Sequence, residues 1–128
     1  MGYRYYNPNP QGHQVGDCTV RAISRALGQS WEATYTALAL HGFMLSDMPS
    51  ANHVWGAYLR SKGYTRHAVP SECPDCYTVA DFARDNPRGT YILALSGHVV
   101  CVRGGDWFDS WDSGGEPPLY YWERSENK

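Results

Sequence analysis

The apolar pattern changes character once along this chain, and that change constrains the fold more than any other feature. In the first two thirds, apolar residues recur every three or four positions, whereas from residue 89 they form short runs rich in β-branched and aromatic residues. The first part predicts helices over residues 18–27, 30–42, 50–62 and 78–86, and the second predicts strands over residues 90–95, 98–103, 107–111 and 119–123. Because the two kinds of element are segregated, we expect an α+β fold, with N-terminal helices packed on one side of a C-terminal antiparallel sheet.

Residues at the predicted helix ends support these bounds. Asp17 precedes the first helix as an N-cap and Gly28 follows it, while Thr78 and Asp81 have the spacing of a capping box. Residues 3–16 are rich in proline, asparagine and glycine, so we expect an extended arm or loop there rather than a regular element.

Composition excludes several classes of function. The chain has 128 residues, 42% of them hydrophobic, which suits a single domain over residues 1–128. A net charge of −2 gives no basic field for nucleic acid, so no nucleic-acid partner is expected. No window approaches the roughly 18 apolar residues of a membrane span, and no signal peptide is evident. We therefore expect no membrane association and a cytoplasmic location, with delivery by a phage as the alternative route to an external substrate.

Cys18 lies in the first turn of the first predicted helix. Unpaired backbone N–H groups and the helix dipole favour negative charge there, which lowers the pKa of a thiol. The same N–H groups can stabilise an oxyanion that forms beside the sulfur. Cys18 is therefore a candidate nucleophile, and a small buried packing residue is the alternative interpretation.

His98 and Asp109 lie on two strands that the Gly104-Gly105 pair predicts to form a hairpin. With a two-residue turn, Val100 lies opposite Asp109, and Asp109 shares the face of His98. His98 is then a candidate general base and Asp109 the group that orients its ring. A three-residue loop would instead place Asp112 opposite His98, so the sequence leaves both acidic residues open.

A cysteine opening an N-terminal helix, then a strand histidine, then Asp109-Ser110-Trp111 on the next strand resemble the papain-like cysteine peptidase superfamily. The last three residues resemble the Asn-Ser-Trp of papain. The segment Gly16-Asp17-Cys18-Thr19 is similar to the Asp-Cys-Ser of NlpC-type cell-wall peptidases, and small bacterial and phage members resemble the wider stretch. The resemblance implies a papain-like fold in which Cys18 is the nucleophile, His98 the base and then the acid, and Asp109 the orienting group.

The match to papain is incomplete around the nucleophile. The interval from Cys18 to His98 is shorter than in papain, and no glutamine lies six positions before Cys18. A side-chain donor for the oxyanion is therefore sought among the amides just upstream, of which Gln14 is the nearest.

These observations predict a thiol hydrolase, a cysteine peptidase or amidase that cleaves an amide or isopeptide bond through an acyl-enzyme, without a cofactor. The substrate classes that stay open are a peptide, peptidoglycan and a protein conjugate. The alternative is a catalytically silent papain-like module that presents the arm or aromatic residues to a protein partner.

The remaining cysteines carry weaker signals. Cys73 and Cys76 have the spacing of half a zinc site or of a redox pair, but no second pair of ligands follows, so we expect a proline-containing turn and no metal. Cys101 alternates with valines and is predicted to be a packing residue. In a reducing compartment the cysteines are expected to be free thiols.

Overall fold

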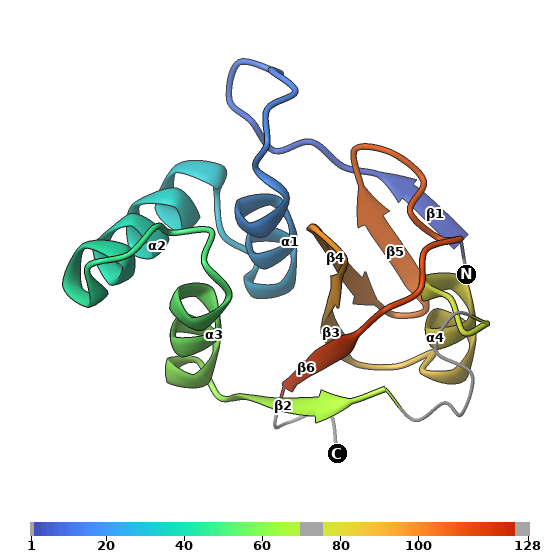
Figure 1. Cartoon of the computed structure of the whole chain (residues 1–128). Helices are drawn as coiled ribbons and strands as arrows, with labels where there is room; N and C mark the ends of the chain where they lie inside the picture. Colours follow the sequence, from blue (N-terminus) through green and yellow to red (C-terminus); the bar gives the residue numbers. More distant parts are fainter. Residues whose placement is uncertain (1, 70–75, 125–128) are drawn as a thin grey trace.

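A computed structural model describes residues 2–69 and 76–124 of the chain, and within them it has an α+β fold with four helices and a six-stranded mixed sheet (Figure 1). In chain order the elements are β1 (Gly2–Tyr5), α1 (Cys18–Leu27), α2 (Trp31–Leu45), α3 (Asn52–Ser61), β2 (Tyr64–Ala68), α4 (Val79–Asp85), β3 (Thr90–Leu95), β4 (His98–Arg103), β5 (Asp106–Asp109) and β6 (Tyr120–Arg124).

The strands lie in the order β1-β5-β4-β3-β6-β2. Four of the five neighbouring pairs are antiparallel, but β1 runs parallel to β5, with Tyr5 paired to Asp109. The prediction of a purely antiparallel sheet is therefore wrong at this edge. The start of the proline-rich arm, expected to lack regular structure, forms an edge strand because β5 offers it an open row of backbone groups.

The hairpin between β4 and β5 has the register that a two-residue turn predicts. Arg103 pairs with Asp106 and Cys101 with Phe108, so Gly104 and Gly105 form the turn. Both glycines have positive φ angles, 61° and 82°, as the tight turns of two-residue hairpins require. This register brings the end of β5 beside the start of β4.

Helices cover both faces of the sheet, not one face as expected. Helices α1, α2 and α3 pack on one face, in a cluster that includes Ile23, Trp55 and Ile92. Helix α4 packs on the other face through Val79 and Phe82, and Figure 1 shows it on the far side of the sheet from α1. The strands between the helices are buried on both sides, which explains why β3 has no exposed position.

Helix α2 extends further than the sequence predicts. It continues through Gly42, which was expected to end it. Glycine is needed at this position for another reason, because the following loop folds back so closely that a Cβ atom would lie 2.7 Å from the Asp47 carbonyl oxygen. The helix ends at Leu45, and the C-cap residue Ser46 has a left-handed conformation (φ 56°).

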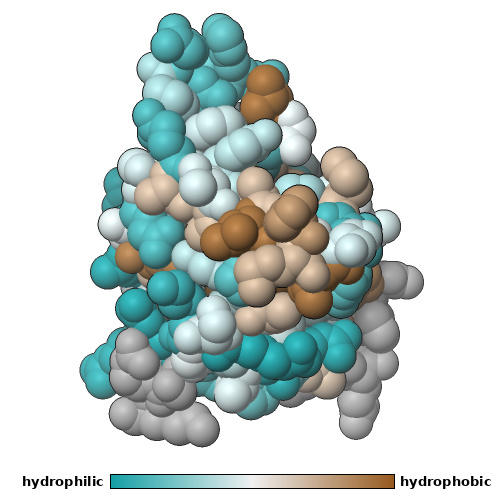
Figure 2. Space-filling view, turned by 90° about the vertical axis from the view of Figure 1, so that its left-hand side faces the viewer, coloured by the Kyte–Doolittle hydropathy of each residue, from teal (hydrophilic) through white to brown (hydrophobic). Residues whose placement is uncertain are grey.

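The outer face of α2 is apolar but exposed. Phe43 is 82% exposed and Met44 is 67% exposed. Figure 2 faces this side of the molecule and shows apolar side chains gathered across its middle. None of the helices in the described ranges has the length and apolarity needed to cross a bilayer.

Candidate active site

Cys18, His98 and Asp109 come from three different elements that meet at one end of the sheet. Cys18 is the first residue of α1, which packs against β4; His98 is the first residue of β4, and Asp109 is the last residue of β5. The hairpin register therefore sets the position of Asp109 relative to His98, and the packing of α1 sets the position of Cys18.

The imidazole of His98 is held by the carboxylate of Asp109. Nε2 of His98 lies 2.6 Å from Oδ2 of Asp109, and the His98 side chain is only 14% exposed. Burial lowers the pKa of His98, but hydrogen bonds and charge from Asp109 and Cys18 outweigh it and raise that pKa to about 9. Since Asp109 binds Nε2, Nδ1 is the ring nitrogen left to face Cys18.

The half-buried thiol of Cys18 is surrounded by donors that favour its ionised form. Burial raises its pKa, but the hydrogen bond and charge of His98 oppose that effect, as do hydrogen bonds from the Val99 N–H and the Thr19 hydroxyl. Together these contacts bring the pKa of Cys18 below its ordinary value of 9.0. The geometry thus favours a thiolate beside an imidazolium.

Asp109 is fully buried, and its carboxylate has several partners besides His98. Oδ2 accepts a hydrogen bond from the Ser113 hydroxyl (2.7 Å), and Oδ1 accepts one from the Ser110 backbone N–H (2.8 Å) and an ion pair from Arg21 Nη2 (3.1 Å). Burial raises the pKa of Asp109, but the His98 and Ser113 hydrogen bonds and the charges of His98 and Arg21 outweigh it, so the pKa is lowered. The carboxylate stays ionised and keeps its negative charge toward His98.

The ion pair between Asp17 and Arg21 extends this network into α1. Arg21, 5% exposed, lies between Asp109 and Asp17, and the second oxygen of Asp17 accepts a hydrogen bond from Trp31 Nε1 at 2.8 Å. Asp17 precedes α1 as predicted, but its side chain makes no cap hydrogen bond to the helix backbone. It turns to Arg21 and Trp31 instead, and leaves the N–H groups beside Cys18 uncapped.

Of the two acidic candidates, Asp109 contacts His98, and Asp112 has other partners. Asp112 accepts hydrogen bonds from Trp107 Nε1 (2.8 Å) and the Gly114 N–H (3.0 Å) and stabilises the loop after β5.

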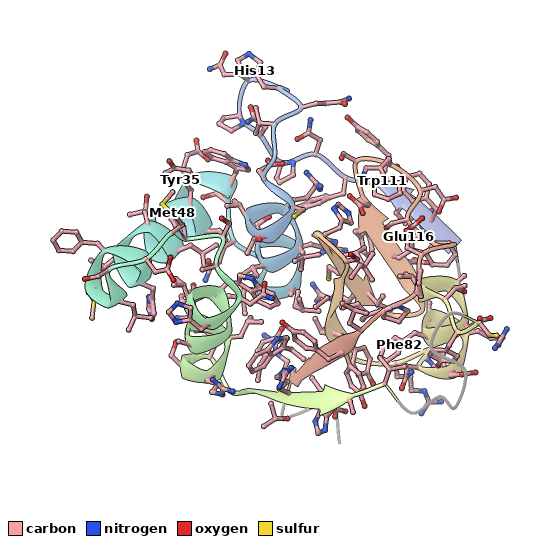
Figure 3. The ribbon with its side chains drawn as sticks, viewed as in Figure 1. His13, Tyr35, Met48, Phe82, Trp111 and Glu116 are labelled. Carbon is pink, nitrogen blue, oxygen red and sulfur yellow. The ribbon has the colours of Figure 1, made fainter. Side chains whose placement is uncertain are left out.

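Trp111 lies over the His98 ring, with 4.9 Å between ring centroids. Its half-exposed indole, labelled in Figure 3, partly shields the imidazole from solvent.

The edge strand β1 holds Asp109 from the other side. The carbonyl oxygen of Asp109 accepts a hydrogen bond from the Tyr6 N–H at 2.8 Å and another from the Tyr3 hydroxyl at 3.1 Å. The arm of the chain therefore fixes the backbone of the residue that orients His98, a role that its composition did not indicate.

A pocket of about 350 Å³ contains Cys18 and His98. Gln14, the amide predicted to lie near the nucleophile, is exposed on the arm and does not line this pocket, and His13 beside it lies at the tip of the protruding loop in Figure 3. Asn52, the first residue of α3, lines the pocket instead. Its Oδ1 accepts a hydrogen bond from Trp55 Nε1 (3.2 Å), which leaves the amide nitrogen as a donor.

The other candidate residues lie apart from this site. Cys101 is buried among packing residues as predicted, and burial raises its pKa to about 12. Cys76 is disulfide-bonded rather than a free thiol, while Cys73 lies outside the described residues. Within residues 2–69 and 76–124, no group of three or more His, Cys, Asp or Glu side chains is placed to hold a metal ion.

Comparisons with protein-family models, with curated proteins and with solved structures each gave no match to this chain.

Proposed function

We propose that this protein is a papain-like thiol hydrolase that cleaves an amide-type bond, with Cys18 as nucleophile, His98 as proton carrier and Asp109 as the group that orients it. The observation that carries the proposal is the chain of contacts from a thiol at a helix N-terminus, through the imidazole, to a fully buried carboxylate 2.6 Å from Nε2. Within this chain of contacts the pKa of Cys18 is lowered, that of His98 is raised and that of Asp109 is lowered, as a thiolate–imidazolium pair requires.

In the proposed reaction the Cys18 thiolate adds to the carbonyl carbon of the substrate, and the carbonyl oxygen becomes an oxyanion. When the tetrahedral intermediate collapses, the carbon–nitrogen bond breaks and the His98 imidazolium gives its Nδ1 proton to the leaving amine. Neutral His98 then takes a proton from water, whose oxygen attacks the thioester. The acid product leaves, and the thiolate and imidazolium are restored.

Two sets of donors suit the oxyanion. The first N–H groups of α1 have no intrahelical acceptor, and the side chain of Asp17 does not cap them. Asn52 of α3 lines the same pocket, and because its Oδ1 accepts from Trp55 Nε1, its amide nitrogen is the group left to donate. We assign it the side-chain donor role that the sequence suggested for Gln14.

The test is the pH dependence of Cys18 alkylation by iodoacetamide, read by mass spectrometry. We expect the parent protein to react at Cys18 below the pH at which an ordinary thiol ionises, and the His98→Ala variant to lose that reactivity. His53→Ala is the matched control, because the His53 side chain is exposed, pairs with Asp47 and does not line the pocket of Cys18 and His98. Cys101 serves as an internal reference that stays unlabelled while the protein is folded.

One observation favours the second candidate, a catalytically silent interaction module. The exposed apolar face of α2, which includes Phe43 and Met44, is a surface of the kind that proteins bind. A binding module has no need of a thiol with a depressed pKa. If Cys18 reacts in the parent as an ordinary thiol and does not respond to His98→Ala, this second function replaces the first.

A further inference from the structure

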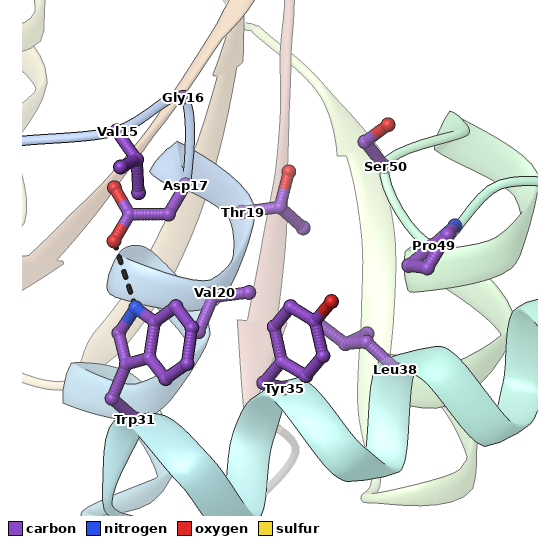
Figure 4. A pocket seen from close by; sticks show the side chains of 10 residues that line it. All are labelled: Val15, Gly16, Asp17, Thr19, Val20, Trp31, Tyr35, Leu38, Pro49 and Ser50. Atoms are coloured by element: carbon purple, nitrogen blue, oxygen red, sulfur yellow. Dashed lines mark hydrogen bonds between the residues drawn. The ribbon is translucent and has the colours of Figure 1, made fainter. Parts of the chain in front are cut away.

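A second cavity opens beside the candidate active site, on the side of Cys18 away from β4. It has a volume of about 290 Å³ and shares three lining residues, Gly16, Thr19 and Ser50, with the pocket that holds Cys18 and His98. Figure 4 shows Trp31 and Tyr35 extending from α2 on one side of it and the loop residues Pro49 and Ser50 on the other. The two cavities therefore adjoin at these three residues, two of which, Gly16 and Thr19, flank Cys18 closely in the sequence.

The surface of this cavity is apolar and offers no free charge. Trp31 and Tyr35 stack with 5.0 Å between ring centroids, and Val20 and Leu38 complete the inner surface. The single ionised group in the lining, Asp17, already has both carboxylate oxygens bound, by Arg21 and by Trp31. A charged side chain would be buried here without a partner, which costs free energy, whereas an apolar side chain would be buried without that cost.

The size of the cavity suits one large side chain. An engineered apolar cavity of about 150 Å³ accommodates benzene, so about 290 Å³ is enough for an aromatic ring or a branched aliphatic side chain with its first carbon. Tyr35, which lines the cavity, is 51% exposed. Its partial exposure is explained if a ligand covers it.

The position of His98 determines which half of the substrate faces the cavity. The leaving amine must lie at His98 to receive its proton, and no residue of β4 lines the apolar cavity. The acyl half, which stays bonded to Cys18, therefore extends the other way, past Gly16 and Thr19. Along this acyl half, the residue nearest to the cavity is the one whose carbonyl carbon Cys18 attacks, so its side chain is the one that enters the cavity.

We infer that this cavity is a specificity pocket for an aromatic or branched aliphatic side chain on the acyl side of the scissile bond, so that the substrates are peptide-like chains with such a residue at the cleavage point. The inference rests on the proposed function, since it needs Cys18 to be the nucleophile.

The experiment uses the N-acetyl chloromethyl ketones of phenylalanine, leucine, glycine, lysine and aspartate. In each reaction the Cys18 thiolate displaces chloride, a thioether forms, and the rate constant is read by mass spectrometry. We expect the phenylalanine and leucine reagents to react at least about tenfold faster than the glycine reagent, and the charged reagents to gain nothing over glycine.

Two variants on one helix locate the effect. Tyr35→Ala removes part of the cavity wall and should reduce the ratio of the phenylalanine rate to the glycine rate toward one. Phe43→Ala, on the same helix but outside the cavity, should leave that ratio as in the parent. Taking the ratio within each variant removes any general change in the reactivity of the thiol.

Iodoacetamide labelling of the same samples separates the two levels of the argument. If Cys18 has the pH dependence of an ordinary thiol, the proposed function and this inference are both wrong. If Cys18 has the expected depressed pKa but the phenylalanine, leucine and glycine reagents react equally, the pocket inference alone is wrong. It is also wrong if Phe43→Ala lowers the ratio as much as Tyr35→Ala does.

Discussion

Replacing Asp109 with asparagine tests whether this carboxylate controls the charge of His98. The change keeps the shape of the side chain and an oxygen acceptor, and removes the negative charge. Burial lowers the pKa of His98, while Asp109 and, to a smaller extent, Cys18 raise it to about 9. The rise from the ordinary value of 6.5 corresponds to about 3 kcal/mol in favour of the imidazolium.

Asp109 contributes more to that rise than Cys18 does, through both its hydrogen bond and its charge. Asp109→Asn should therefore lower the pKa of His98 by at least about one unit, because a neutral amide oxygen stabilises the imidazolium much less than a carboxylate does. Without a charged imidazolium the Cys18 thiolate loses its partner, so the pKa of Cys18 should rise. We expect iodoacetamide labelling of Cys18 near pH 6 to slow by about tenfold or more, and the rates to converge above pH 9, where His98 is neutral in both proteins.

The matched control is Asp112→Asn, which removes the same charge three residues further along the chain. Asp112 bonds to Trp107 and the Gly114 N–H and does not contact His98. Its labelling profile should equal that of the parent, and circular dichroism should show that both variants are folded. The reasoning is refuted if Asp109→Asn keeps the parent profile, or if Asp112→Asn shifts the profile by the same amount.

Two further predictions concern stability, measured by urea unfolding. Arg21→Met should destabilise the protein by about 3–5 kcal/mol, because it leaves the buried carboxylate of Asp17 without its cation and leaves Asp109 paired with His98 alone. Arg84→Met, at an exposed surface pair, should change little, and equal effects would contradict the buried network. Gly114→Ala should cost about 1–3 kcal/mol, because its Cβ would lie 2.6 Å from the Trp107 ring, and the neighbouring Gly115→Ala, which meets nothing within 4 Å, is the control that should stay near the parent.

The parts of the fold that the sequence predicted correctly are those set by local signals. Helix α1 has the predicted bounds, with Asp17 before it and Gly28 in a left-handed conformation after it, although the Asp17 side chain makes no cap hydrogen bond. The β4–β5 register is the one that a two-residue Gly104-Gly105 turn predicts, one of the two turn lengths that the sequence left open. That register brought Asp109 to His98 and excluded Asp112, so the pairing of the two residues was predictable once the turn length was known.

The parts that were missed depend on partners far away in the chain. Strand β1 forms because β5 lies beside it, and nothing in Gly2–Tyr5, just before the stretch rich in proline and asparagine, indicates that neighbour. Arg21 occupies a helical position that faces the core, but its partner Asp109 lies 88 residues further on. The four-residue spacing from Asp17 to Arg21 was the one local sign of an ion pair, and it gave no indication that the pair is buried.

The charges around the candidate site form a single alternating series, which explains how so many ionised groups fit into a buried region. The Cys18 thiolate faces the His98 imidazolium, which faces the Asp109 carboxylate; Arg21 follows, and then Asp17, whose last oxygen is bound by Trp31.

Because each charge is stabilised by the next, the state of the thiol depends on residues that do not touch it. Trp31 ends this series and also forms a wall of the apolar cavity. A side chain bound in that cavity would thus contact the last member of a network whose first member is the Cys18 thiol, so that under the proposed function substrate recognition and thiol ionisation would share Trp31.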